Sequence, residues 1–172
     1  MNEKIPVMFD RMLRPEWIDY ALQQFLTAKD ETALRKDLTT FLTNQVAGQQ
    51  TVVKVARQLN RTVGFKSSIP RTKLEEYHCK MSVLSPDERM HLRLQILVES
   101  TPFVADCVTA IKKLSLLGVD GVELTQMYDR QVARYGDRSM VYRRVRYVLQ
   151  TLAFMGAVEN RNRRWFLAKW VE

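Results

Sequence analysis

The stretch Ser139–Trp170, SMVYRRVRYVLQTLAFMGAVENRNRRWFLAKW, contains the change of hydrophobic period that decides the fold of this chain. In its first half the apolar residues recur every three or four positions, which predicts an amphipathic helix over Ser139–Met155. Gly156 ends this helix, and the period then shortens to two. We therefore predict two short strands, Ala157–Glu159 and Trp165–Trp170, around a polar turn.

The residues before this stretch supply another helix. Apolar residues from Val122 to Val132 share a helical period, which Tyr135-Gly136 closes. Helix, turn, helix and hairpin is the order expected of a winged helix-turn-helix. The sequence thus predicts a winged-helix-like C-terminal domain over residues 119–172 with a short C-terminal β-hairpin. We place the domain boundary, a flexible one, between Leu117 and Gly121.

The earlier part of the chain has a helical period almost throughout. Its clearest start signal is the capping box Ser85-Pro86-Asp87-Glu88, which predicts a helix over Pro86–Glu99. A similar start at Thr101-Pro102 predicts a helix that runs to Gly118, a natural left-handed residue after a helix. We expect a helical bundle over residues 1–118 and a mainly α fold overall. Its other predicted helices are one that begins near Pro15, Ala33–Val46 and Gln50–Val63.

The composition is that of a globular protein. The chain has 172 residues, of which 46% are hydrophobic and 27% charged, and only six glycines and five prolines. These values exclude wholesale disorder and collagen-like sequences. Cys79 and Cys107 lie 28 positions apart without a CxxC spacing, so they predict neither a disulfide framework nor a zinc site. With no signal-like apolar stretch and no spanning segment, we expect a cytoplasmic protein.

Charge is the first feature that points to a partner. Lys and Arg number 27 against 19 Asp and Glu, which gives a formal net charge of +8. Between Asp137 and Glu172 there are eight basic and three acidic residues, so this stretch carries +5 of the total. Such a balance favours a polyanionic partner, either nucleic acid or an anionic membrane surface.

The predicted helix Ser139–Met155 has two distinct faces. At 100° per residue an apolar stripe faces inward, and the opposite side carries arginine and glutamine. These side chains pair with phosphates and base edges in a major groove, although a solvated helix face has a similar composition. The stripe consists of Val141, Val145, Val148 and Leu152. The candidate DNA-binding residues here are Arg138, Ser139, Arg143, Arg144, Arg146 and Gln150, with Arg144 on the flank.

The polar turn of the predicted hairpin contains three more arginines, Arg161, Arg163 and Arg164. Their mutual repulsion is unfavourable without an anion nearby. A wing tip that follows phosphates, or one that enters a minor groove, requires this composition.

A second basic zone lies in the N-terminal part. Lys54, Arg57 and Arg61 share one helix face, and the zone continues through Lys66, Arg71 and Lys73. A solvated helix face is the favoured interpretation. A second helix-turn-helix within Leu34–Arg61 is the alternative.

No pattern predicts catalysis, a metal or a cofactor. His78 and His91 fall on different predicted helices, and the motifs HExxH, GxSxG, GxGxxG and GxxxxGK[ST] do not occur. Adjacent His78 and Cys79 point about 100° apart on a helix, so they do not form a nucleophile–base pair. The acidic pairs, such as Asp87-Glu88, are better explained as helix caps than as a Mg²⁺ site.

The order of elements resembles the BrxA family, small accessory proteins of the bacterial BREX phage-defence systems. The resemblance rests on the start Leu84–Glu88 and on Val145-X-X-Val148-Leu149-X-X-Leu152-X-X-Met155-Gly156-Ala157-Val158. It is a pattern of spacing from about Trp17 to Val158, and the family's opening stretch is not clear in Met1–Arg14. The resemblance implies a NusB-like helical domain, a winged-helix-like part, and DNA binding next to other BREX-system proteins.

We therefore expect a non-enzymatic accessory protein that binds double-stranded DNA, with no membrane and no small-molecule substrate as partner. The alternatives are a protein-interaction adaptor and a winged-helix transcriptional regulator. RNA binding ranks third, because the sequence has no RNP-type aromatic pair.

Overall fold

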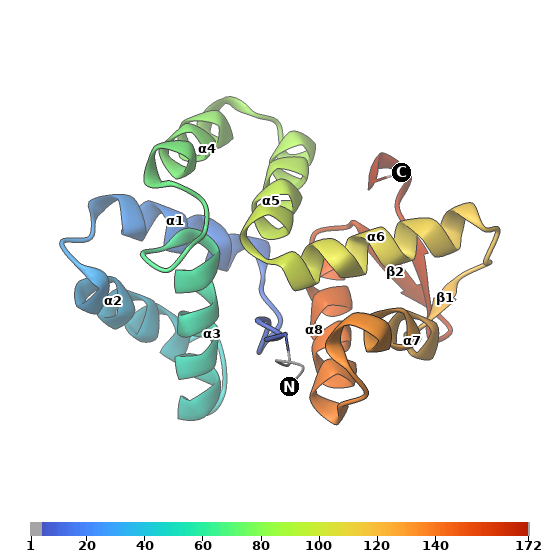
Figure 1. The fold of residues 1–172 in the computed structure, drawn as a ribbon. Coiled ribbons are helices and arrows are strands. Elements are labelled where there is room, and N and C mark those ends of the chain that lie inside the picture. The colour runs from blue at the N-terminus through green and yellow to red at the C-terminus, as the bar shows by residue number, and fades with distance from the viewer. Residues whose placement is uncertain (1–4, 172) are drawn as a thin grey trace. The chain divides into compact units, whose positions relative to one another are not determined.

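The computed structural model describes residues 5–171 (Figure 1). Helices make up most of these residues, and short strands in the C-terminal third form an antiparallel sheet. The mainly helical class predicted from the sequence is confirmed. The described residues divide into two compact units: the helical unit, residues 13–101, and the sheet unit, residues 5–12 together with 102–171.

Local start signals set the helices of the helical unit. The predicted capping box opens one of them: Ser85 Oγ accepts from the backbone N–H of Glu88 at 3.3 Å, and the Glu88 carboxylate accepts from the N–H of Ser85 at 2.8 Å. Asp30 caps another, because its carboxylate accepts from the N–H of Ala33 at 2.8 Å. The helices are α1 (Pro15–Thr27), α2 (Glu31–Thr43), α3 (Gln49–Val63), α4 (Arg71–Val83) and α5 (Pro86–Ser100).

The core of the helical unit is formed by large apolar side chains from several helices. Trp17 and Leu22 of α1, Leu38 of α2, Leu59 of α3 and Ile96 of α5 are fully buried. Burial of one such side chain contributes about 1.5–3 kcal/mol. Tertiary packing therefore stabilises helices that are too short to persist alone.

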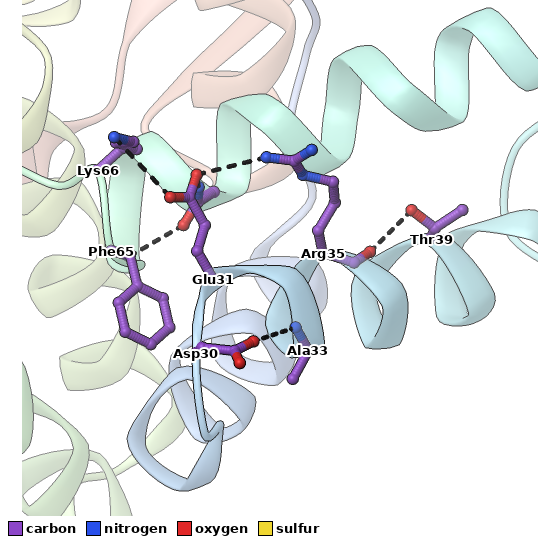
Figure 2. A network of polar contacts seen from close by, with 8 residues as sticks. Asp30, Glu31, Ala33, Arg35, Thr39, Phe65 and Lys66 are labelled. Carbon is purple, nitrogen blue, oxygen red and sulfur yellow. Dashed lines mark hydrogen bonds and ion pairs between the residues drawn. The ribbon is translucent and has the colours of Figure 1, made fainter.

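A polar network joins the start of α2 to the turn after α3 (Figure 2). The carboxylate of Glu31 accepts from Asn60 Nδ2 at 3.0 Å. It also forms ion pairs with Arg35 at 3.5 Å and with Lys66 at 3.8 Å. Asn60 Oδ1 accepts from the N–H of Phe65 at 2.9 Å, which fixes the turn. One carboxylate thus contacts two cations of this surface.

In the described residues the sheet unit combines three α-helices with a three-stranded sheet. Its strand order is β1-β3-β2, and Trp165 of β3 lies opposite Val122 of β1 on one side and Asn160 of β2 on the other. All pairs are antiparallel. The elements are α6 (Pro102–Leu116), β1 (Val122–Glu123), α7 (Leu124–Tyr135), α8 (Ser139–Phe154), β2 (Val158–Arg161), β3 (Arg164–Leu167) and the 3₁₀ turn η1 (Lys169–Val171).

The compact units do not divide at residue 118, where the sequence predicts the domain boundary. The division falls between Thr101 and Pro102, and α6 belongs to the sheet unit. Phe103 of α6 packs edge-on against Tyr135 of α7 at 5.0 Å between ring centroids, and Asp106 accepts from the Tyr135 hydroxyl at 2.5 Å. A glycine after a helix marks the end of that helix, and it carries no information on which core the helix joins.

Gly118 itself has the predicted role. It has φ +80°, its N–H donates to the carbonyl of Ser115, and the N–H of Val119 donates to that of Leu114. These two bonds form a Schellman motif that closes α6.

Residues 5–12 pack into the sheet unit, which nothing in the sequence predicts. The side chains of Val7 and Phe9 are buried. Arg144 of α8 donates to the carbonyl of Val7 and forms an ion pair with Asp10. The contact joins residues 134 positions apart, beyond the reach of any periodicity in the sequence.

The strands differ in detail from the prediction. Val122 was expected in a helix, but it forms β1, and α7 begins only at Leu124. The second hairpin strand ends at Leu167, and Trp170 lies in η1, where its indole N–H donates to the carbonyl of Gly156 at 3.1 Å. A two-residue strand is too short to show an alternating pattern, so only its pairing with β3 identifies it.

The turn of the hairpin is tighter than predicted. Arg161 pairs with Arg164, which leaves Asn162 and Arg163 as the two turn residues, with φ +51° and +63°. Positive φ at both positions is the type I′ geometry that matches the twist of the flanking strands. A residue with a side chain held in this region costs about 1–2 kcal/mol, less for Asn.

Gly121 is the position where the sheet unit tolerates no side chain. Its φ is +75°, and a Cβ there would lie 2.6 Å from Phe166 Cζ and 2.8 Å from Arg164 Cβ. We expect Gly121→Ala to lower the free energy of unfolding by about 2–4 kcal/mol, because overlap and backbone strain add. Gly118→Ala is the matched control: φ is +80° but the space is open, so only about 1 kcal/mol is lost. Urea denaturation measures both, and equal losses would contradict a close contact at Gly121.

Candidate nucleic-acid interface

The apolar stripe of α8 fixes which face of this helix is exposed. Val141, Val145, Val148 and Leu152 are all buried, as the helical period predicts. The four side chains pack into the sheet unit along the length of the helix. The opposite face of α8 is therefore held outward by core packing.

That outer face carries the central group of candidate residues. Arg143 and Arg146 are exposed, and neither forms a hydrogen bond or an ion pair with any residue between 5 and 171. Ser139 is exposed and Gln150 half-buried. At 100° per residue these four positions lie within about 60° of one another. The guanidinium groups of Arg143 and Arg146 therefore keep their hydrogen-bond donors available on one face of the helix.

One flank of α8 is covered by residues 5–12. The Arg144 side chain, a flank residue of the predicted DNA-binding set, is only 20% exposed and is paired with Asp10 inside the sheet unit. Arg11 donates to the Tyr147 hydroxyl at 3.3 Å and lies over the same ring. Arg138 donates to the carbonyls of Tyr135 at 2.9 Å and Ile5 at 3.1 Å. Arg138 and Arg144 thus leave the candidate set.

The other flank is set by the turn between α7 and α8. Gly136 has φ +80° and ends α7, and the Tyr128 hydroxyl donates to Asp137 Oδ1 at 2.5 Å. The ring of Tyr128 meets that of Tyr142 edge-on at 5.6 Å. The hydrogen bond to the carboxylate raises the pKa of Tyr128, which keeps its proton on the hydroxyl. These contacts hold the first turn of α8 against α7.

The three arginines of the β2–β3 hairpin are not equivalent. Arg161 lies over the ring of Phe166, with its guanidinium carbon 4.0 Å from the centroid, and its Nε is 3.6 Å from the Glu159 carboxylate. Arg164 pairs with Glu123 at 3.3 Å and donates to the carbonyl of Asp120 at 3.0 Å. Arg163 is exposed and has no such partner among the described residues. A count of charges does not distinguish the three arginines, because Phe166, Glu123 and the Asp120 carbonyl reach Arg161 and Arg164 from other segments of the chain.

The second basic zone belongs to the helical unit, whereas α8 and the hairpin belong to the sheet unit. Its predicted continuation is neutralised within the unit: Lys66 pairs with Glu31, Arg71 with Glu75 at 3.2 Å, and Lys73 with Glu99 at 2.9 Å. On α3, Lys54 and Arg57 form no ion pair with residues 5–171, and Arg61 has interactions within the chain. Only Lys54 and Arg57 thus remain as candidates.

Arg130 is a further cation of the sheet unit, and no charge pattern in the sequence marks it as a candidate. Arg130 of α7 is exposed and without a hydrogen bond or ion pair in the described part of the chain. The adjacent Asp129 cancels its charge in any count along the sequence. The signal that could have found it is its place on the first helix of the helix pair, which crosses the DNA backbone in helix-turn-helix proteins.

The residues considered for catalysis have other surroundings. Glu88 is part of the capping box, where the backbone N–H and the hydroxyl of Ser85 lower its pKa. Burial raises the pKa of the Cys107 thiol, so this thiol stays protonated and unreactive. His78 and His91 lie on α4 and α5, both exposed. Within residues 5–171 there is no group of three or more His, Cys, Asp or Glu side chains placed to hold a metal ion.

Two further findings concern the chain and not the candidate interface alone. Within the described residues no single helix is both long and apolar enough to cross a membrane, and α5 and α6 reach that measure only when counted together. No family model and no curated protein matches this chain.

Proposed function

We propose that this chain is a non-enzymatic protein that binds double-stranded DNA through the sheet unit, with α8 as recognition helix. The element order α6-β1-α7-α8-β2-β3 and the strand order β1-β3-β2 support a winged helix-turn-helix. The observation that carries the proposal is the outer face of α8. Its two arginines are exposed and have no partner among the described residues, although carboxylates balance many other cations of the chain.

In this function α8 enters the major groove, which is about 12 Å wide and admits a helix. Arg143 and Arg146 contact phosphates at the groove edges, and Gln150 lies on the same face toward the bases. Arg130 contacts the backbone beside α7, and the hairpin tip reaches the DNA next to the helix. Phosphate contacts fix the register of the protein without selecting a sequence.

The biological setting follows from the resemblance to the BrxA family. We propose that the protein acts as an accessory factor of a BREX-type phage-defence system in the bacterial cytoplasm, together with other BREX-system proteins. The spacing pattern from Leu84 to Val158 supports this setting. The helical unit then supplies a docking face, or a second DNA contact through Lys54 and Arg57.

A salt series tests the proposal. The full chain is titrated with a random-sequence duplex of about 24 base pairs, and the dissociation constant is measured by fluorescence anisotropy between 50 and 200 mM KCl. Three or four phosphate contacts predict a slope of log affinity against log salt of about −3. Absence of binding at 50 mM KCl, or an affinity that salt leaves unchanged, would refute DNA binding.

One observation favours a protein-interaction adaptor as the second candidate. Leu116 and Leu117, at the end of α6, are 87% and 71% exposed, and adjacent exposed leucines are typical of contact surfaces. An adaptor would fail the salt series. A transcriptional regulator would pass it and would bind one sequence far more tightly than random duplex.

A further inference from the structure

The tip of the β2–β3 hairpin places an arginine where glycine is the favoured residue. Asn162 and Arg163 form the two-residue type I′ turn, both with positive φ. Asn is common at the first of these positions and Gly at the second. Arg163 occupies the second, at φ +63°. The hairpin thus retains a cation at its tip in a backbone conformation that glycine would adopt with less strain.

The neighbouring arginines are drawn back onto the hairpin and its sheet. Arg161 lies on Phe166 and beside Glu159, and Arg164 contacts Glu123 and the carbonyl of Asp120. Among the described residues of the turn, Arg163 alone presents a guanidinium without a partner. A wing that followed phosphates along a strand would present all three cations. This tip presents one cation, Arg163, beside the side-chain amide of Asn162.

We propose that Arg163, with Asn162 beside it, inserts into the minor groove and selects A·T-rich duplex, an inference that rests on the proposed DNA binding. The minor groove is about 6 Å wide, whereas a two-stranded hairpin is about 10 Å across, because the distance of about 4.8 Å between its strand axes is widened by the backbone atoms outside each axis. The hairpin backbone therefore stays outside, and a single side chain at its tip enters.

The chemistry of the groove selects the base composition. A·T pairs present only the acceptors adenine N3 and thymine O2, which the guanidinium of Arg163 and the amide of Asn162 can both reach as donors. G·C pairs add the guanine N2 amino group, a donor that repels both. A·T tracts also narrow the groove, which strengthens its negative potential and attracts arginine.

The test compares two duplexes of equal length that differ only in a central block of six base pairs, all A·T or all G·C. Both are titrated with the full chain by anisotropy, and melting temperatures are measured in parallel. We expect the unmodified chain to bind the A·T duplex about fivefold more tightly or better. We expect Arg163→Gly to reduce this ratio below about twofold. It should leave the melting temperature unchanged or higher, because glycine relieves the strain at this position.

Two further variants make the outcome decisive. Arg163→Asn tolerates the same backbone conformation without the cation, so it should lose the preference even if the glycine variant folds poorly. Arg163→Lys keeps the charge but carries a more strongly hydrated ammonium, and should lose most of the preference while non-specific affinity changes little.

Equal binding of both duplexes by the unmodified chain would overturn minor-groove selection and leave the proposed function intact. The preference surviving in Arg163→Gly or Arg163→Asn would also overturn it. Absence of binding to either duplex would instead refute the proposed function, and the inference with it.

Discussion

Replacing both Arg143 and Arg146 with alanine should weaken binding to random duplex DNA by about 10- to 100-fold near 100 mM salt, and should shallow the salt slope by about two. Each arginine is expected to neutralise one phosphate, and each lost contact removes one step of counterion release. Anisotropy titrations of the double variant across the same salt series measure both quantities. Folding should be unaffected, because exposed side chains without partners change stability by only about ±0.5 kcal/mol.

The control for this prediction removes the same charge from the same unit. Lys112 and Lys113 lie on α6 and have no ion pair within the described residues. If Lys112→Ala/Lys113→Ala weakens binding as much as the α8 variant, the charge acts diffusely and α8 is not the recognition helix. Arg144→Ala is the second control. Because Arg144 is paired with Asp10 inside the sheet unit, we expect it to lower stability and leave the salt slope unchanged.

Comparing duplexes of different sequence distinguishes a base contact of Arg143 or Arg146 from a phosphate contact. A bidentate contact to a base would cost about 1–3 kcal/mol on a preferred sequence and less elsewhere. A phosphate contact costs the same on every sequence. We expect the second result, because the function proposed above requires no selection of a long site.

Phe9→Ala should lower the free energy of unfolding of the sheet unit by about 3–5 kcal/mol. The Phe9 side chain is fully buried although it lies in an irregular segment near the N-terminus, and its removal leaves a cavity in the sheet unit. Urea denaturation measures the loss. Hydrogen exchange locates it: amides of α6, α7 and α8 should lose protection, while those of α1–α5 keep theirs.

The neighbouring residue provides the matched control. Met8 is 38% exposed, so Met8→Ala should cost less than about 1 kcal/mol. Similar losses for Phe9→Ala and Met8→Ala would contradict the burial of this segment. Loss of protection confined to the helical unit would contradict the assignment of residues 5–12 to the sheet unit.

The features that the sequence predicts correctly are local. The capping box at Ser85 and Glu88 joins residues three positions apart, and the Schellman motif at Gly118 closes within a single turn. The buried stripe of α8 repeats every three or four residues. In each case the interacting groups lie within about one helical turn, so the pattern in the sequence contains the whole interaction.

The candidate site is predictable only in part, for the same reason. The outward positions of Arg143 and Arg146 follow from the helical period, whereas the fate of the other arginines depends on distant partners. Arg144 meets Asp10, 134 positions away, and Arg164 meets the Asp120 carbonyl, 44 positions away. Formal charge counts each arginine equally, and only the contacts separate paired cations from unpaired ones.

By itself, then, the amino-acid sequence determined most helices of this protein, the position of its hairpin and the exposed face of α8, because periodicity and caps act over a few residues. The tertiary structure alone decided that α6 and residues 5–12 join the sheet unit, that Val122 pairs as a strand, and that Arg163 is the hairpin arginine without a partner among the described residues. These outcomes depend on contacts between segments far apart in the chain, where the energy of packing and ion pairing is shared by residues that no local pattern connects.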